Sequence, residues 1–108
     1  MTGTAQTKDG RALELADDGG RRAYVARLDG EVVASAYYRR SAGLITFTHT
    51  ETDDALEGQG VASALVRFAL DDVRARGDER VRPQCPFVRS WLERHPGTYD
   101  DLLQPAGA

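Results

Sequence analysis

Short runs of alternating hydrophobic and polar residues fill the first half of the chain, a pattern typical of β-strands. The runs that predict strands lie at residues 12–15, 24–28, 31–38 and 44–50. Asp29-Gly30 separates the second and third runs and indicates a tight hairpin, because both central turn positions adopt positive φ. In the fourth run, strict alternation places Ile45, Phe47 and His49 on one face of a strand. The first half therefore predicts an antiparallel meander.

In the second half the hydrophobic period changes from that of a strand to that of an α-helix. Hydrophobic residues at helical spacing predict an amphipathic helix over 61–76, and Gly77 follows where a helix end favours a left-handed residue. A short strand is expected at 79–82, and a second helix over 87–94 ends before Pro96. The sequence thus predicts an α+β fold, with a mainly antiparallel sheet, a central helix and a C-terminal helix.

Length and composition set the expected domain organisation. The chain has 108 residues, of which 41% are hydrophobic and 29% are charged, which is ordinary for one globular domain. A single domain is predicted over 11–104. The segments 1–10 and 105–108 are small and polar, and both are expected to be flexible.

The charge balance excludes some classes of partner. With 14 Lys and Arg against 17 Asp and Glu, the formal net charge is -3, so no nucleic-acid partner is expected. No stretch is apolar enough to span a bilayer, and the N-terminus lacks the apolar run of a secretory signal. We therefore expect a cytoplasmic protein without a membrane partner. Cys85 is the single cysteine, which excludes an internal disulfide and a cysteine-based zinc cluster, and no metal is expected.

The segment 56–63 joins the meander to the first helix and contains Gly58 and Gly60. Backbone N–H groups at a helix N-terminus are unpaired, and the helix dipole places partial positive charge there. Glycines allow an anion such as phosphate to approach those groups closely. On glycine spacing alone, a tight loop that enters a helix without any ligand is an equally good interpretation.

This loop resembles a motif of the GNAT acyltransferase superfamily. Residues 57–62 are similar to its pyrophosphate-binding motif, usually written Q/R-x-x-G-x-G/A, with Glu57 at the first position. Three further stretches resemble a small single-domain family of this type, which carries HTEV-P near the loop and P-x-C-x-F-V and HPEY near the end. These stretches are 47–51, 83–88 and 93–99. The chain departs from the pattern at 52–53, where the family tends to have Val-Pro, and by an insertion at 97–98.

The resemblance implies a GNAT-like fold with acetyl-CoA as co-substrate. In such folds pantetheine lies between the strand before the loop and the strand after the helix, and the pyrophosphate lies on the loop. The residues that the resemblance assigns to the cofactor are Thr52, Gly58, Gln59, Gly60, Val61, Ala62 and Ser63. The thioester is expected near the end of the next strand, close to Cys85.

Cys85, His49 and Glu51 are the candidate catalytic residues. Acyl transfer to an amine needs a neutral nucleophile, an acceptor for its proton and donors for the developing oxyanion. Cys85 is interpreted as a transient acyl acceptor or a general acid to the CoA thiolate, and equally as a small buried residue. His49 is by default a hydrogen-bonded core histidine, with a base for the amine as the alternative. Glu51 is a second candidate base, or a group that attracts a cationic amine.

Other polar residues near these motifs also have two interpretations. The acidic run over 51–57 is by default solvated surface, and otherwise suits a polyamine-like or basic-protein acceptor. Tyr99 lies in the region where many GNAT enzymes keep a tyrosine general acid. Arg89 and Arg94 are surface residues, unless either contacts the 3′-phosphate of CoA.

The sequence therefore predicts an acetyl-CoA-dependent N-acetyltransferase that acts on an amine-bearing small molecule, peptide or protein. Two alternatives stay open: a CoA-binding or regulatory module without turnover, and an interaction domain without a cofactor. The turns at 17–20 and 29–30 leave no room for the helices that cover the acceptor side in longer GNAT enzymes. We expect a large or polymeric acceptor, or a second subunit, to complete that side. The chain is expected to be a monomer or a homodimer.

Overall fold

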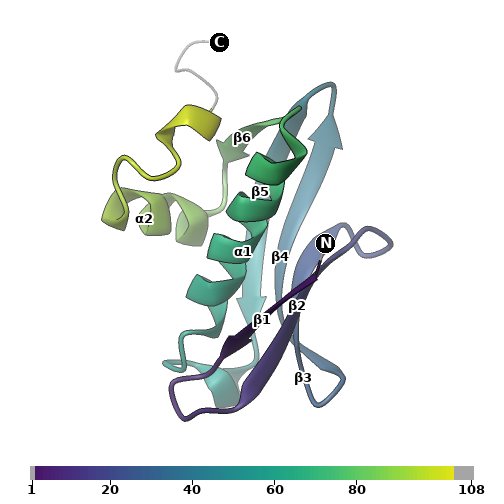
Figure 1. Ribbon diagram of the computed structural model, residues 1–108, viewed down its shortest axis with the longest axis vertical. Helices are drawn as coiled ribbons and strands as arrows, with labels where there is room; N and C mark the ends of the chain where they lie inside the picture. The colour runs from purple at the N-terminus through teal and green to yellow at the C-terminus, as the bar shows by residue number, and fades with distance from the viewer. Residues whose placement is uncertain (1, 104–108) are drawn as a thin grey trace.

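The computed structural model describes residues 2–103, which form a six-stranded sheet with two α-helices (Figure 1). The strands are β1 (Thr2–Gln6), β2 (Ala12–Asp18), β3 (Ala23–Leu28), β4 (Glu31–Ser41), β5 (Leu44–Thr52) and β6 (Arg80–Pro83). The helices are α1 (Val61–Arg76) and α2 (Pro86–Arg94), with short 3₁₀ turns at Asp54–Leu56 and Asp100–Leu102. This arrangement confirms the predicted α+β class.

The strands follow one another across the sheet in sequence order, from β1 to β6. Neighbours are antiparallel from β1 to β5, whereas β5 and β6 are parallel. A parallel pair needs a crossover connection, and α1 provides it while packing along one face of the sheet (Figure 1). The parallel pairing ends at Phe47 and Pro83, beyond which β5 continues and β6 does not. The two strands therefore separate at this point.

The core lies between α1, α2 and the sheet. Its largest fully buried side chains include Trp91, Tyr24, Phe47, Leu65 and Leu70. On α1, the buried residues recur at the helical spacing seen in the sequence, because one stripe of the helix rests on the sheet. Burial of these apolar side chains is the main contribution that holds α1 in place.

A buried polar cluster fixes the C-terminal half of α1 to the sheet. The Tyr24 hydroxyl donates a hydrogen bond to Asp72 at 2.6 Å, and the Tyr38 hydroxyl donates to Asp17 at 2.5 Å. Arg40 forms ion pairs with Asp17 and Glu79 at 3.2 and 2.9 Å. Burial and the neighbouring carboxylate raise the pKa of Tyr24, and the same two causes raise the pKa of Tyr38 to about 12.

A β-bulge in β5 corrects the expected position of His49. The β4–β5 register passes from Tyr38 opposite Phe47 to Tyr37 opposite His49, so Thr48 is an extra residue in β5. Side chains alternate between faces along a strand, and one extra residue reverses that alternation. His49 therefore does not share the buried face of Ile45 and Phe47, and its side chain is 57% exposed. The prediction of a core histidine on that face is wrong.

The N-terminal segment also differs from expectation. Thr2–Gln6 form β1, which pairs antiparallel with β2, so the prediction that residues 1–10 are flexible is wrong for these five residues. Gly3 lies so close to α1 that a Cβ at this position would come within 2.7 Å of the Phe68 ring. Residue 1 and residues 104–108, including the predicted flexible segment 105–108, lie outside the described part of the chain.

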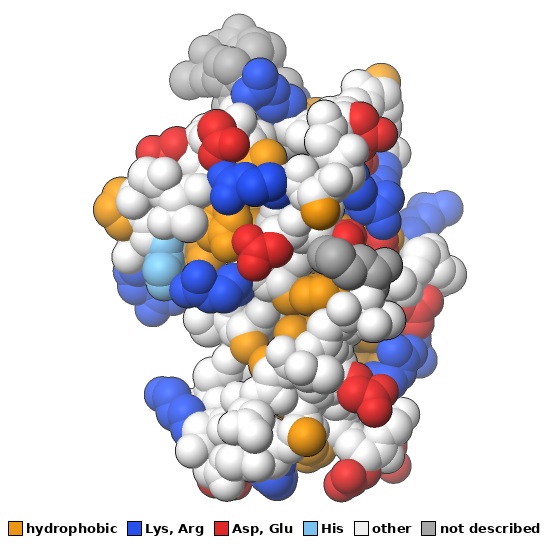
Figure 2. Space-filling model, viewed as in Figure 1, with side chains coloured by type: hydrophobic (Ala, Val, Ile, Leu, Met, Phe, Trp, Pro, Cys, Tyr) orange, Lys and Arg blue, Asp and Glu red, His pale blue; other side chains and the backbone are white. Residues whose placement is uncertain are grey.

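Charges of both signs are interspersed on the face of the molecule that carries α1 (Figure 2). Hydrophobic side chains show between them only in small areas. Within residues 2–103, neither helix has the length and apolar character required to cross a membrane.

Candidate functional site

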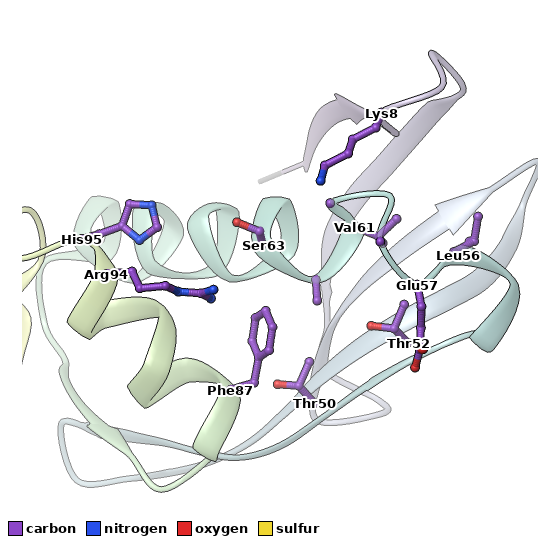
Figure 3. A pocket seen from close by; sticks show the side chains of 13 residues that line it. Lys8, Thr50, Thr52, Leu56, Glu57, Val61, Ser63, Phe87, Arg94 and His95 are labelled. Atoms are coloured by element: carbon purple, nitrogen blue, oxygen red, sulfur yellow. The ribbon is translucent and has the colours of Figure 1, made fainter.

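A pocket opens where the start of α1, the end of β5 and α2 face one another (Figure 3). We call it the loop cavity; its volume is about 760 Å³. It is lined by Lys8, Thr50 and Thr52, by residues 56–58 and 60–63, and by Phe87, Arg94 and His95. The loop cavity therefore lies at the separation of β5 from β6.

The loop before α1 presents backbone donors to this cavity. Gly58 and Gly60 adopt positive φ angles of 81° and 79°, a conformation that favours glycine. Gly60 is the N-cap of α1 and provides no side-chain hydrogen bond. Ala64 N–H donates to the Gly60 carbonyl at 3.0 Å, whereas the N–H groups of 61–63 have no partner within the helix. With the helix dipole, these groups form a site suited to an anion.

The free edge of β5 forms the opposite wall. Asp53 N–H donates to the Val33 carbonyl at 2.8 Å, so its backbone faces β4. By the alternation of antiparallel pairing, the backbone groups of Thr50 and Thr52 face away from β4 and into the gap left by β6. Such an edge pairs readily with an extended amide-containing chain.

Gln59 is the predicted cofactor residue that does not line the loop cavity. Its carbonyl accepts a hydrogen bond from Lys8 N–H at 3.0 Å, and its side-chain Oε1 accepts from Asp9 N–H at 3.1 Å. The other predicted cofactor residues, Thr52, Gly58, Gly60, Val61, Ala62 and Ser63, all line it. The structure thus brings the predicted set together, with Gln59 turned toward the β1–β2 turn.

One wall of the loop cavity is stiffened by Trp91. Its indole N–H donates to the Ser63 hydroxyl at 2.8 Å, which ties α2 to the first turn of α1. The His95 ring stacks on the indole with centroids 3.9 Å apart, and His95 Nδ1 lies 2.7 Å from the Trp91 carbonyl. Trp91 is fully buried, and the sequence did not indicate that His95 lines the cavity.

Cys85 lies directly behind the β5 wall. It is the N-cap of α2 and only 2% exposed, and its N–H donates to the Phe47 carbonyl at 2.8 Å. Its Sγ lies 3.2 Å from Thr50 Oγ1, and either atom can donate that hydrogen bond. Cys85 therefore touches the loop cavity through Thr50 rather than lining it.

His49 and Glu51 lie on the other side of β5. His49 Nε2 is 2.8 Å from Glu51 Oε1, and the imidazole stacks on Tyr37 with centroids 5.7 Å apart. Because side chains alternate along the strand, this pair faces away from the side of Thr50 and Cys85. The structure therefore joins His49 to Glu51, and separates both from Cys85 by the thickness of β5.

A second pocket, which we call the sheet cavity, has a volume of about 1010 Å³. It is lined by Arg21, Arg27, residues 30–35, Tyr37, residues 50–53 and Glu57. Thr50, Thr52 and Glu57 line both cavities, so the end of β5 separates them. A ligand in each would approach the other across this strand.

Tyr99 lines neither cavity. It is 2% exposed, and its hydroxyl donates to Asp71 of α1 at 2.6 Å. Burial, with a smaller effect of Asp71, raises the pKa of Tyr99 to about 12. This position favours a structural role over that of a general acid. In the described range 2–103, no group of three or more His, Cys, Asp or Glu side chains is arranged to hold a metal ion.

Comparison with known proteins agrees with this geometry. Residues 23–102 match the family model described as GCN5-related N-acetyl-transferase. Protein NATD1 of Bos taurus is 29% identical over 101 residues, which cover 91% of this chain and 88% of that protein. Protein NATD1 of Gallus gallus and of Homo sapiens are each 28% identical over 101 residues, covering 91% of this chain and 91% and 88% of theirs. The family model spans most of the chain, which therefore belongs to the GCN5-related N-acetyltransferase family.

Proposed function

We propose that the protein binds acetyl-CoA in the loop cavity and transfers the acetyl group to an amine that enters from the sheet cavity. The observation that carries this proposal is the uncapped start of α1, which opens into a cavity beside the free edge of β5. The start of α1 suits an anion, and the free edge of β5 suits an extended chain with amide groups. CoA combines them, as a diphosphate joined to pantetheine.

The residues present fit this ligand. The unpaired N–H groups of 61–63 would hold the diphosphate, and the backbone of Thr50 and Thr52 would pair with the pantetheine amides. Arg94 lines the α2 side of the cavity, where it would meet a further phosphate. Bound acetyl-CoA supplies an acetyl group activated as a thioester.

The sheet cavity suits a cationic amine. Four acids line it: Glu31, Glu51, Asp53 and Glu57. Its two arginines, Arg21 and Arg27, share one ion-pair partner, Asp18, at 3.3 Å, and the four lining acids outnumber them. A substrate amine would therefore meet net negative charge at the end of β5.

The His49–Glu51 pair would accept the proton that the amine loses on attack. Glu51 orients the imidazole through the 2.8 Å contact and stabilises it when it becomes charged. Both side chains are more than half exposed, so an incoming amine can reach them.

Cys85 would donate a proton to the CoA thiolate as it leaves. An acyl acceptor must be reachable by the thioester carbonyl, and a sulfur that is 2% exposed behind Thr50 is poorly placed for that role. Proton donation across the Thr50 contact needs no such access. The geometry thus favours direct transfer, with the base and the acid on opposite sides of β5.

The test is release of CoA thiol from acetyl-CoA in the presence of a polyamine, a basic peptide and a neutral primary amine. We expect turnover with the cationic acceptors, and loss of at least about 100-fold in kcat for His49→Ala. CoA binding without turnover on any amine would instead support a regulatory module. Absence of binding at millimolar CoA would favour a cofactor-free interaction domain and contradict the proposal.

A further inference from the structure

We propose that Lys8 contacts the diphosphate of CoA, so that the N-terminal hairpin β1–β2 completes the cofactor site. This inference rests on the proposed function, since it concerns a ligand of the loop cavity. Lys8 is the only lysine in the chain. It precedes the part of the chain that matches the family model, which begins at residue 23.

Lys8 reaches the cavity at its most favourable place for an anion. The side chain extends from the β1–β2 turn toward the first turn of α1, with its ammonium directed to the cavity (Figure 3). A Cβ placed on Gly60 would lie 3.8 Å from Lys8 Cε, so the lysine stem passes directly over the N-cap of α1. An anion held by the unpaired N–H groups of that helix would lie next to this cation.

The turn that carries Lys8 is held to the glycine loop. Lys8 N–H and Asp9 N–H both bond to Gln59, through its carbonyl and its side chain, at 3.0 and 3.1 Å. Within the turn, Arg11 N–H donates to the Thr7 hydroxyl at 2.9 Å, and Thr7 is only 3% exposed. These contacts position Lys8 before any ligand binds, which lowers the entropy cost of the phosphate contact.

The ion pair within the β1–β2 turn does not involve Lys8, so its charge is available to a ligand. The Thr7 hydroxyl donates to Asp9, and Arg11 Nε lies 3.1 Å from the same carboxylate. These two partners lower the pKa of Asp9, Thr7 having the larger effect. Lys8 itself has no ion pair among the described residues, whereas Glu57 brings a negative charge to the cavity wall. Lys8 therefore supplies positive charge where the glycine loop itself carries an acid.

The test compares calorimetric titrations of CoA and of pantetheine, which lacks the diphosphate. Lys8→Met keeps the aliphatic stem and removes the charge, and Lys8→Arg keeps the charge. Arg11→Met is the matched control, because it removes a cation from the same turn but from outside the cavity. We expect Lys8→Met to raise the Kd for CoA by about 3- to 10-fold and to leave that for pantetheine unchanged. Lys8→Arg should bind CoA nearly as the wild type does.

If the wild type binds CoA, three results would overturn the inference. Equal CoA binding by Lys8→Met and the wild type would show that Lys8 makes no contact with the diphosphate. An equal loss for CoA and pantetheine means that the substitution disturbs the shape of the cavity rather than a phosphate contact. An equal loss with Arg11→Met means that only the general charge of the turn matters. If the wild type binds no CoA at all, the proposed function fails, and this inference fails with it.

Discussion

At the scale of single residues, Cys85 and Thr50 mark the point where β5 and β6 separate. The Phe47 carbonyl accepts hydrogen bonds from the N–H groups of both Gln84 and Cys85, which ends the parallel ladder and turns the chain into α2. The thiol is thereby buried at the cavity wall with Thr50 as its partner at 3.2 Å. Its place near the expected thioester position made it a candidate, but the sequence could not show that Thr50 contacts it.

We predict that Cys85→Ala lowers kcat for acetyl transfer by about 100-fold, while the Kd for CoA changes little. The reason is that the substitution removes a proton donor and leaves the backbone of β5 in place. Steady-state kinetics measures kcat, and calorimetry measures the Kd. Thermal unfolding measures any loss of stability from the small cavity that the substitution leaves. Thr50→Val is the companion variant, since it breaks the contact and keeps the thiol. A kcat for Cys85→Ala equal to that of the wild type would reduce Cys85 to a packing residue.

Tyr38 gives a prediction about pH. Its pKa in the folded protein is about 12, raised first by burial and then by Asp17, against ~10 for tyrosine in an unfolded chain. Between these values the unfolded chain loses its proton first, so the free energy of unfolding falls as pH rises from about 10 to about 12. Chemical denaturation across this pH range should show that the free energy of unfolding falls less steeply for Tyr38→Phe than for the wild type. Identical slopes for the two proteins would contradict this assignment.

At the scale of secondary-structure elements, the helices and turns that the sequence predicted well are those determined by residues within the same short stretch. The helix over 61–76 was predicted with its observed bounds, because its hydrophobic stripe and Gly77 lie within the same stretch. The Asp29-Gly30 hairpin was equally clear, since both residues adopt the positive φ that this turn requires.

The elements that were missed depend on partners far away in the sequence. β1 consists of small and polar residues with no pattern, and it is a strand because it pairs with β2 and because Gly3 fits under Phe68. The bulge at Thr48 lies directly after Phe47, the last β5 residue that pairs with β6, and the alternation within β5 gives no sign of it. For that reason the face of His49 could not be deduced by counting residues along the strand.

The two ends of α1 allow a matched experiment on the glycine loop. Gly60 and Gly77 both adopt left-handed φ, 79° and 76°, and neither has a steric obstacle closer than 3.8 Å to an added Cβ. Alanine at either position should cost about 1 kcal/mol of stability through backbone strain. Only Gly60→Ala should also weaken CoA binding, because only Gly60 lines the loop cavity. A difference in stability between the two variants does not bear on the anion site. Equal CoA affinities for Gly60→Ala and Gly77→Ala would argue against the loop as that site.

At the scale of the whole molecule, the candidate site is assembled from segments between residue 8 and residue 95. The sequence indicated the glycine loop through the compact motif at 57–62, and Thr52 only through the resemblance of the surrounding chain. Both line the loop cavity. The sequence could not locate Lys8, which comes to Gly60 only through the pairing of Lys8 with Gln59. For the acidic run over 51–57, the sequence favoured solvated surface and left an acceptor site as the alternative. Glu51, Asp53 and Glu57 of that run line the sheet cavity, together with Glu31 from β4.

The acidic sheet cavity leads to a prediction about the acceptor. Glu31→Gln should raise KM for a polyamine or basic peptide by about 2- to 5-fold, because Glu31 is an exposed charge beside the incoming cation. The KM for a neutral amine should stay the same, and added salt should shrink the difference. Glu93→Gln on α2 is the control, an exposed acid that lines neither cavity. A similar rise for the neutral amine, or for Glu93→Gln, would contradict an electrostatic role of the sheet cavity.

The central claim is that CoA binds between the start of α1 and the free edge of β5. The most direct measurement is a titration of the labelled protein with CoA, followed through the backbone amide resonances in NMR. We predict saturable shifts at Lys8, Gly58 and 60–63, and at Thr50 and Thr52, with smaller changes on the His49 side of the sheet. Resonances that stay unchanged at millimolar CoA, or that shift only around the sheet cavity, would contradict the account.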